Sequence, residues 1–98
     1  MTDKQVVFEG LELNTVEILH QAREMARIMG YEIREEWLAG SGGGGCEFGG
    51  KKWIFLDVAD NPTEQLESVA DVLCQDPAIH LIELPAPLRK LWGIGKVG

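Results

Sequence analysis

Two adjacent glycines, Gly49 and Gly50, stand between two segments of strand-like composition. Because both glycines can adopt positive φ, the pair is typical of the two-residue turn of a β-hairpin. The turn predicts a cross-strand register that pairs Phe48 with Lys51, Glu47 with Lys52 and Cys46 with Trp53. The opposite charges of Glu47 and Lys52 favour this register. The rest of the expected fold is built around this hairpin.

A further strand is predicted over residues 31–37, upstream of the glycine-rich segment. Tyr31, Ile33 and Trp37 alternate there with charged residues, which is typical of a strand with one face in water. The segment from Trp53 to Leu56 is apolar on both faces, as expected for a strand covered on both sides. We therefore expect a small antiparallel sheet of about three strands.

Two amphipathic helices are predicted on either side of these strands. The first follows Asn14, whose side chain can form a capping box with Glu17, and Gly30 stands where a left-handed residue would end the helix. The second follows Asn61 as N-cap, with Pro62 at the first helical position. In both segments apolar residues recur every three or four positions, which predicts one buried stripe per helix.

These elements define a single α+β domain over residues 1–98, in the order α-β-β-β-α. The two main helices are expected on one face of the sheet, and residues 88–92 predict a short C-terminal helix. Residues 1–4 and 93–98 are expected to fray. Two segments stay open: residues 5–8 form an edge strand or an arm, and residues 78–84 form a strand or a helical turn.

The formal net charge of −7 excludes nucleic acid and anionic membranes as expected partners, because both would repel the chain. No apolar run approaches the roughly 20 residues of a membrane span, so we expect a cytoplasmic protein. Cys46 and Cys74 lie 28 positions apart without a close ligand pair, which predicts free thiols and no metal. We expect no cofactor, because no stretch carries a complete catalytic or binding signature.

One face of the predicted sheet would stay apolar unless another element covers it. That face holds either Trp53 and Phe55 or the alternate residues Ile54, Leu56 and Val58. Its cover would be the C-terminal segment or a second copy of the chain in a homodimer. The candidate interface residues are Trp37, Trp53, Phe55 and Trp92. The preferred hypothesis is therefore a protein–protein interaction module that is not an enzyme.

The alternative hypothesis is a thiol-dependent or small-ligand-binding protein that uses the glycine loop. The backbone N–H groups of Gly43, Gly44 and Gly45 could hold an anion beside Cys46, the weak catalytic candidate. The loop can equally be a flexible connection between strands. If the helices cover the Trp53 face, the two thiols are neighbours; if they cover the Ile54 face, the sheet separates them.

Several short motifs between residues 30 and 73 resemble a group of small bacterial proteins with no assigned activity. The motifs are Gly30-Tyr31, Arg34-Glu35-Glu36-Trp37-Leu38, Gly43-Gly44-Gly45-Cys46, Gly50-Lys51-Lys52 and Phe55-Leu56-Asp57. The group shares a glycine run and a cysteine before a hairpin, followed by a helix that begins near a proline. The resemblance implies a bacterial source and supports the hairpin; it implies no activity.

Overall fold

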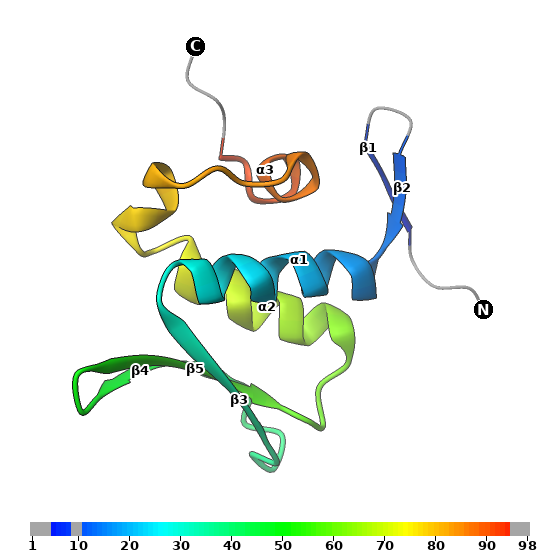
Figure 1. Cartoon of the computed structure of the whole chain (residues 1–98). Coiled ribbons are helices and arrows are strands. Elements are labelled where there is room, and N and C mark those ends of the chain that lie inside the picture. Colours follow the sequence, from blue (N-terminus) through cyan, green and yellow to red (C-terminus); the bar gives the residue numbers. More distant parts are fainter. Residues whose placement is uncertain (1–4, 9–10, 95–98) are drawn as a thin grey trace.

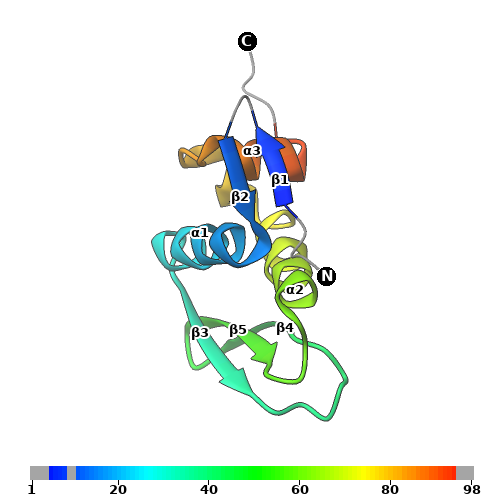
Figure 2. The same ribbon diagram turned by 90° about the vertical axis from the view of Figure 1, so that its right-hand side faces the viewer.

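A computed structural model describes residues 5–8 and 11–94 of the chain. The elements are β1 (Gln5–Phe8), β2 (Leu11–Asn14), α1 (Thr15–Ile28), β3 (Tyr31–Glu36), β4 (Gly44–Phe48), β5 (Lys51–Asp57), α2 (Pro62–Leu73), the 3₁₀ helix η1 (Pro77–Leu81) and α3 (Ala86–Trp92). They form three layers: the sheet of β3, β4 and β5, then α1 with α2, then α3 with the β1–β2 hairpin (Figures 1 and 2). The predicted α+β class is confirmed.

The β4–β5 hairpin has the predicted register, with Cys46 opposite Trp53 and Glu47 opposite Lys52. Gly49 and Gly50 take φ values of 61° and 80°, as a turn with two positive-φ residues requires. The glycine pair alone therefore fixed the turn and the pairing of the two strands.

The expectation of a wholly antiparallel sheet is wrong, because the sheet is mixed, with strand order β3-β5-β4. β3 runs parallel to β5, with Ile33 opposite Ile54. Residues 37–43 carry the chain past the end of β5 and place β4 on its far side. The most apolar strand is thus central and the charged β3 is an edge, which buries more apolar surface than the reverse order.

Both main helices begin where their caps predicted. In α1 the Glu17 N–H donates to Asn14 Oδ1 at 2.9 Å, and Asn14 N–H donates back to Glu17 Oε1 at 3.3 Å. Asn61 and Glu64 form the same reciprocal pair at the start of α2. After α1, Gly30 has a φ of 95°, the left-handed conformation expected there.

The two helices pack on the sheet face that carries Ile54 and Leu56, both fully buried. α1 lies against β3, and α2 lies against β4 and β5. On α2, Val72 approaches so closely that a Cβ at Gly45 would be 3.0 Å from its methyl carbon. The buried apolar residues of the core come from α1, β5, α2, η1, α3 and their flanks: Ile18, Leu19, Ala22, Ala26, Met29, Ile54, Leu56, Leu66, Val69, Leu73, Ile79, Leu84 and Leu88.

The structure resolves both open segments. Residues 5–8 form a strand that pairs antiparallel with Leu11–Asn14. Residues 77–81 form a 3₁₀ turn capped by Asp76, so the segment after α2 is a helical turn and not a strand. The predicted C-terminal helix is present as α3, and Gly93 ends it with a φ of 69°. Residues 1–4 and 95–98, expected to fray, lie outside the described residues. None of the helices described is long and apolar enough to cross a membrane.

Candidate functional site

We call the face of the sheet that points away from the helices the outer face. It carries a cluster of aromatic side chains. Side chains alternate along a strand, and cross-strand partners share a face. With Ile54 and Leu56 on the inner face, β5 directs Trp53 and Phe55 outward, and their ring centroids lie 6.2 Å apart. β4 adds Cys46 and Phe48 to this face, and the Phe48 side chain is 74% exposed.

No described helix covers the outer face. The C-terminal helix α3 lies on the opposite side of α1 and α2, as Figure 1 shows. The C-terminal segment, as far as residue 94, is therefore not the cover considered from the sequence. Trp53 and Phe55 stay half-buried, although aromatic rings are the side chains that gain most from being covered.

Charged side chains border the aromatic cluster in balanced numbers. The outward residues of β3 are Glu32, Arg34 and Glu36, and β5 adds Lys51 beside them. Arg34 Nε lies 2.7 Å from Glu36 Oε2, and Lys51 Nζ lies 3.9 Å from Glu32 Oε2. The solvent-accessible charged groups of this face, two acidic and two basic, thus cancel in formal charge, although the chain as a whole carries −7. Asp57, the cross-strand partner of Glu36, is fully buried.

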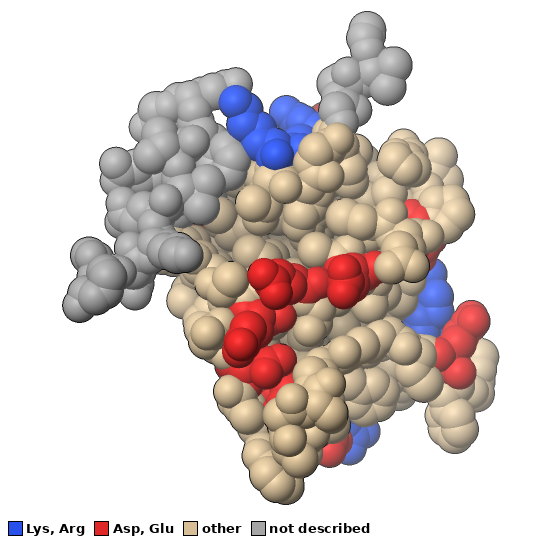
Figure 3. All heavy atoms as spheres, turned by 180° about the vertical axis from the view of Figure 1, so that it is seen from behind, with Lys and Arg blue, Asp and Glu red and all other residues tan. Residues whose placement is uncertain are grey.

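The acidic excess lies elsewhere. Seen from behind, on the side of α2, acidic side chains form a band across the molecule (Figure 3). Glu64, Glu67 and Asp71 are exposed on α2 at helical spacing and project on one side. A basic partner would be attracted to this band, whereas the outer face offers it no net charge.

The structure brings two of the four predicted interface residues together and separates the others. Trp53 and Phe55 are neighbours on β5. Trp37 follows the last residue of β3 and is 72% exposed. Trp92 lies on α3, half-buried against the hydrophobic core on the far side of the helix layer. An interface on the outer face would thus not include Trp92.

The sheet separates the two thiols, because the helices cover the Ile54 face. Cys46 lies on the outer face, whereas Cys74 caps the C-terminus of α2 on the helix side. Both cysteines are free and exposed. Although residue 74 is exposed overall, neighbouring atoms partly shield its thiol from water and raise the pKa of Cys74, and the nearby Asp71 carboxylate raises it further.

Backbone N–H groups of the crossover loop and of the turn after β5 form an anion-binding nest, and its anion is the chain's own Asp57 carboxylate. The N–H groups predicted for such a nest, those of Gly43, Gly44 and Gly45, are not among these donors. Asp57 ends β5 and is fully buried. Its Oδ1 accepts hydrogen bonds from the N–H groups of Ala59 at 2.9 Å and Leu38 at 3.1 Å. Its Oδ2 accepts one from Gly40 at 3.0 Å. The nest thus ties the crossover loop to the end of β5.

These contacts lower the pKa of Asp57. The hydrogen bond from Ala59 contributes most; burial opposes it, and the N–H groups of Leu38, Gly40 and Gly42 add to the lowering. The candidate ligand residues Gly43, Gly44, Gly45 and Cys46 follow this nest and lead directly into β4. Part of the loop's anion-binding capacity is therefore used inside the fold.

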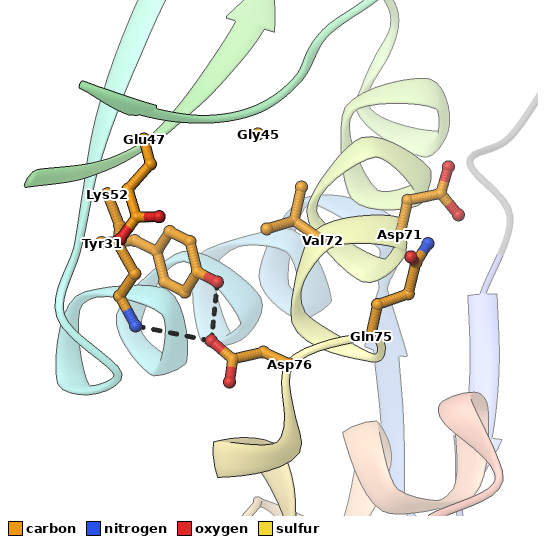
Figure 4. Close-up of a pocket in the computed structure, with 8 residues that line it drawn as sticks. All are labelled: Tyr31, Gly45, Glu47, Lys52, Asp71, Val72, Gln75 and Asp76. Carbon is orange, nitrogen blue, oxygen red and sulfur yellow. Dashed lines mark hydrogen bonds and ion pairs between the residues drawn. The ribbon is translucent and has the colours of Figure 1, made fainter.

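A second polar cluster lies in an open hollow of about 580 Å³ between the inner edge of the hairpin and the end of α2 (Figure 4). The Tyr31 hydroxyl donates to Asp76 Oδ2 at 2.7 Å, and Lys52 Nζ lies 3.4 Å from the same oxygen. The Lys52 ammonium also lies 4.5 Å from the centre of the Tyr31 ring. Lys52 thus turns toward Asp76, although Glu47 is its cross-strand partner.

Burial raises the pKa of Tyr31 to about 12, helped by the hydrogen bond to Asp76 and by its charge. The same hydrogen bond is the main cause that lowers the pKa of Asp76, assisted by the Ala78 N–H and by Lys52. Asp76 also caps η1, since its Oδ1 accepts from the Ala78 N–H at 2.9 Å. This cluster therefore joins β3, β5 and the turn after α2, and every polar group in it has a structural partner.

Sequence reasoning missed the roles of Asp57 and Asp76. Each carboxylate meets groups far away in the chain: Asp57 binds residues 17 and 19 positions earlier, and Asp76 binds Tyr31, 45 positions earlier. One signal was present for Asp57, because a carboxylate directly after an apolar strand must find hydrogen-bond donors if it is buried. The nearest donor along the chain is the N–H of Ala59, two positions later, and the loop before β4 supplies the N–H groups of Leu38 and Gly40.

Comparison with protein-family models, curated proteins and solved structures finds no significant match to this chain. The resemblance to small bacterial proteins therefore stays a prediction. The function has to be argued from the outer face, the loop and the hollow themselves.

Proposed function

We propose that this chain is a non-enzymatic protein–protein interaction module that binds through the outer face of its sheet. One observation carries the proposal: Trp53, Phe55 and Phe48 form an aromatic surface that no described helix covers. Apolar patches on soluble domains mark docking sites, and tryptophan is the residue most enriched among those that dominate binding energy.

The electrostatics support the same surface. Charged groups border the aromatic residues and balance one another. A typical protein–protein interface likewise has an apolar centre and a polar rim. An acidic partner would be repelled by the acidic band on α2. On the outer face the acidic and basic groups balance, so an uncharged or acidic partner meets no repulsion there. We also propose a bacterial, cytoplasmic protein, in keeping with the two free thiols.

The alternative function, a thiol-dependent or ligand-binding site at Cys46 and residues 42–45, has weaker support. Asp57 already takes the N–H group of Gly40, and Gly44 and Gly45 are paired with Phe55 and Ile54 in the sheet, which leaves fewer donors for an external anion. Cys46 lies among aromatic residues of the outer face, where a small exposed thiol fits an interface as well as a reactive site.

Site-specific photo-crosslinking in the natural host tests the proposed function. A photoreactive phenylalanine analogue replaces Phe48, which is 74% exposed on the outer face. The matched control places it at Leu81, which is 84% exposed on η1, beyond the helix layer. We expect a covalent protein adduct from position 48 and none from position 81. Equal adducts from both positions, or none from position 48, would contradict the proposal.

A further inference from the structure

The outer face has an uneven shape as well as an aromatic composition. Its β5 column carries the two large rings, Trp53 and Phe55, whereas the neighbouring β4 column carries the small residues Cys46 and Gly44 at the same heights. Nothing lies within 4 Å of a Cβ placed on Gly44, so the space beside Phe55 is open. A ridge of aromatic rings therefore runs beside a shallow trough.

Because the ridge and the trough lie side by side, the ridge of one copy can fit into the trough of a second copy. We propose that its occupant is a second copy of this chain, related by a two-fold axis that runs parallel to the strands between β4 and β5. Such an axis keeps each residue at its own height and exchanges the two columns. Trp53 of one copy then faces Cys46 of the other, and Phe55 faces Gly44.

The same axis also removes the electrostatic obstacle to pairing two chains of charge −7. The charged β3 column, with Glu32, Arg34 and Glu36, stays at the two outer rims in water. Lys51 of one copy faces Phe48 of the other, an ammonium against an aromatic ring and not against its own kind. A two-fold axis in the plane of the interface but perpendicular to the strands would stack β3 on β3 and bury its charged side chains between the two copies, so the cost of desolvating these charges selects the parallel axis.

The acidic band lies on the exposed side of α2, within the helix layer, on residues such as Glu67. In this dimer the two bands are separated by both sheets, so their repulsion is screened over more than one Debye length of about 8 Å. This inference rests on the proposed function, because it names the protein that occupies the same surface.

The first arm of the test measures mass by sedimentation or light scattering over a range of concentrations. We expect it to rise toward twice 10.8 kDa. Gly44→Lys fills the trough without strain in the monomer, since Gly44 has neither positive φ nor a close neighbour. We expect it to weaken dimerisation by at least about tenfold with an unchanged circular dichroism spectrum. Gln75→Lys, exposed beyond α2, makes the same charge change and should leave the dimer intact.

The second arm uses the two native thiols, which report opposite sides of the sheet. Sheets packed about 10 Å apart, with strands about 4.8 Å apart, place the two Cys46 Cα atoms about 11 Å from each other, within reach of a short bismaleimide. The Cys74→Ser variant, which keeps Cys46, should crosslink into a covalent dimer. The Cys46→Ser variant, which keeps Cys74, should stay monomeric on the denaturing gel.

A monomer at every concentration, a dimer that Gly44→Lys leaves unchanged, or crosslinking through Cys74 instead of Cys46 would each overturn the second-copy inference. The photo-crosslink at position 48 then separates the two proposals. An adduct with a different protein would leave the interaction function standing and refute the homodimer. A monomer with no adduct at position 48 would refute both.

Discussion

Gly43 is the glycine for which the structure gives the sharpest mutational prediction. A Cβ at this position would lie 2.0 Å from the Phe55 carbonyl oxygen, 3.1 Å from its carbonyl carbon and 3.2 Å from Leu56 Cα. Real Cβ atoms essentially never approach closer than 3.0 Å, and all three atoms belong to the backbone. Gly43→Ala must therefore move the chain next to β5 by about 1 Å or more.

That movement falls on the central strand, directly beside the fully buried Leu56. Overpacking of this kind destabilises a domain by about 3 kcal/mol. For a domain of this size each kcal/mol lowers the melting temperature by about 4–8 °C, so we expect a fall of about 12–24 °C. Gly44→Ala is the matched control: its Cβ meets nothing within 4 Å, its φ is not positive, and it should change stability by less than about 1 kcal/mol.

The assay is urea denaturation of the wild type and both variants, followed by circular dichroism at one dilute protein concentration that keeps self-association constant. Equal m-values would show that the variants unfold the same structure. If the Gly43→Ala midpoint matches that of Gly44→Ala, the close approach of residue 43 to β5 is refuted, and with it the account of why the crossover loop is rich in glycine.

Three further predictions concern the titrating groups. Tyr31 is the only tyrosine, so the tyrosinate absorbance of the native chain should titrate with a midpoint near pH 12. The Asp76→Asn variant should shift this midpoint toward the ordinary value of 10.0. A midpoint at 10.0 in the native chain would refute the buried hydrogen bond. Because folding raises this pKa, the stability it contributes is intact below pH 10 and is lost as the pH rises through about 12, which thermal melts at alkaline pH should show. Folding lowers the pKa of Asp57, so the stability that Asp57 contributes is present above pH 3.8 and is lost as the pH falls below this value. The Asp57→Asn variant should lower the melting temperature by several degrees at neutral pH and flatten the acid side of the plot of stability against pH. An unchanged plot would contradict the hydrogen bonds to Asp57. In the Cys46→Ser variant, Cys74 should react with maleimide more slowly in the native chain than in urea, because its pKa is raised; equal rates would speak against its partial burial.

Local sequence signals determined the elements of this protein. The caps at Asn14 and Asn61, the break at Gly30 and the turn at Gly49-Gly50 all act within three or four residues, so neighbouring side chains suffice to specify them. The hydrophobic stripes likewise predicted which sides of α1 and α2 are buried. From these, the α+β class and the hairpin register followed.

Tertiary structure alone decided the strand order, the covered face and the carboxylate contacts. A strand that is apolar on both faces does not indicate which neighbour it takes or which face meets the helices, so the parallel pairing of β3 with β5 was missed. Asp57 and Asp76 each accept one hydrogen bond from an N–H two residues later, but their other partners lie 17 to 45 residues away, a separation that periodicity does not encode. The hairpin register already places Phe55 next to Gly44, but this face is open only because the helices pack on the Ile54 and Leu56 side of the sheet. Local interactions fix elements, whereas surfaces and sites arise from the long-range packing that joins them.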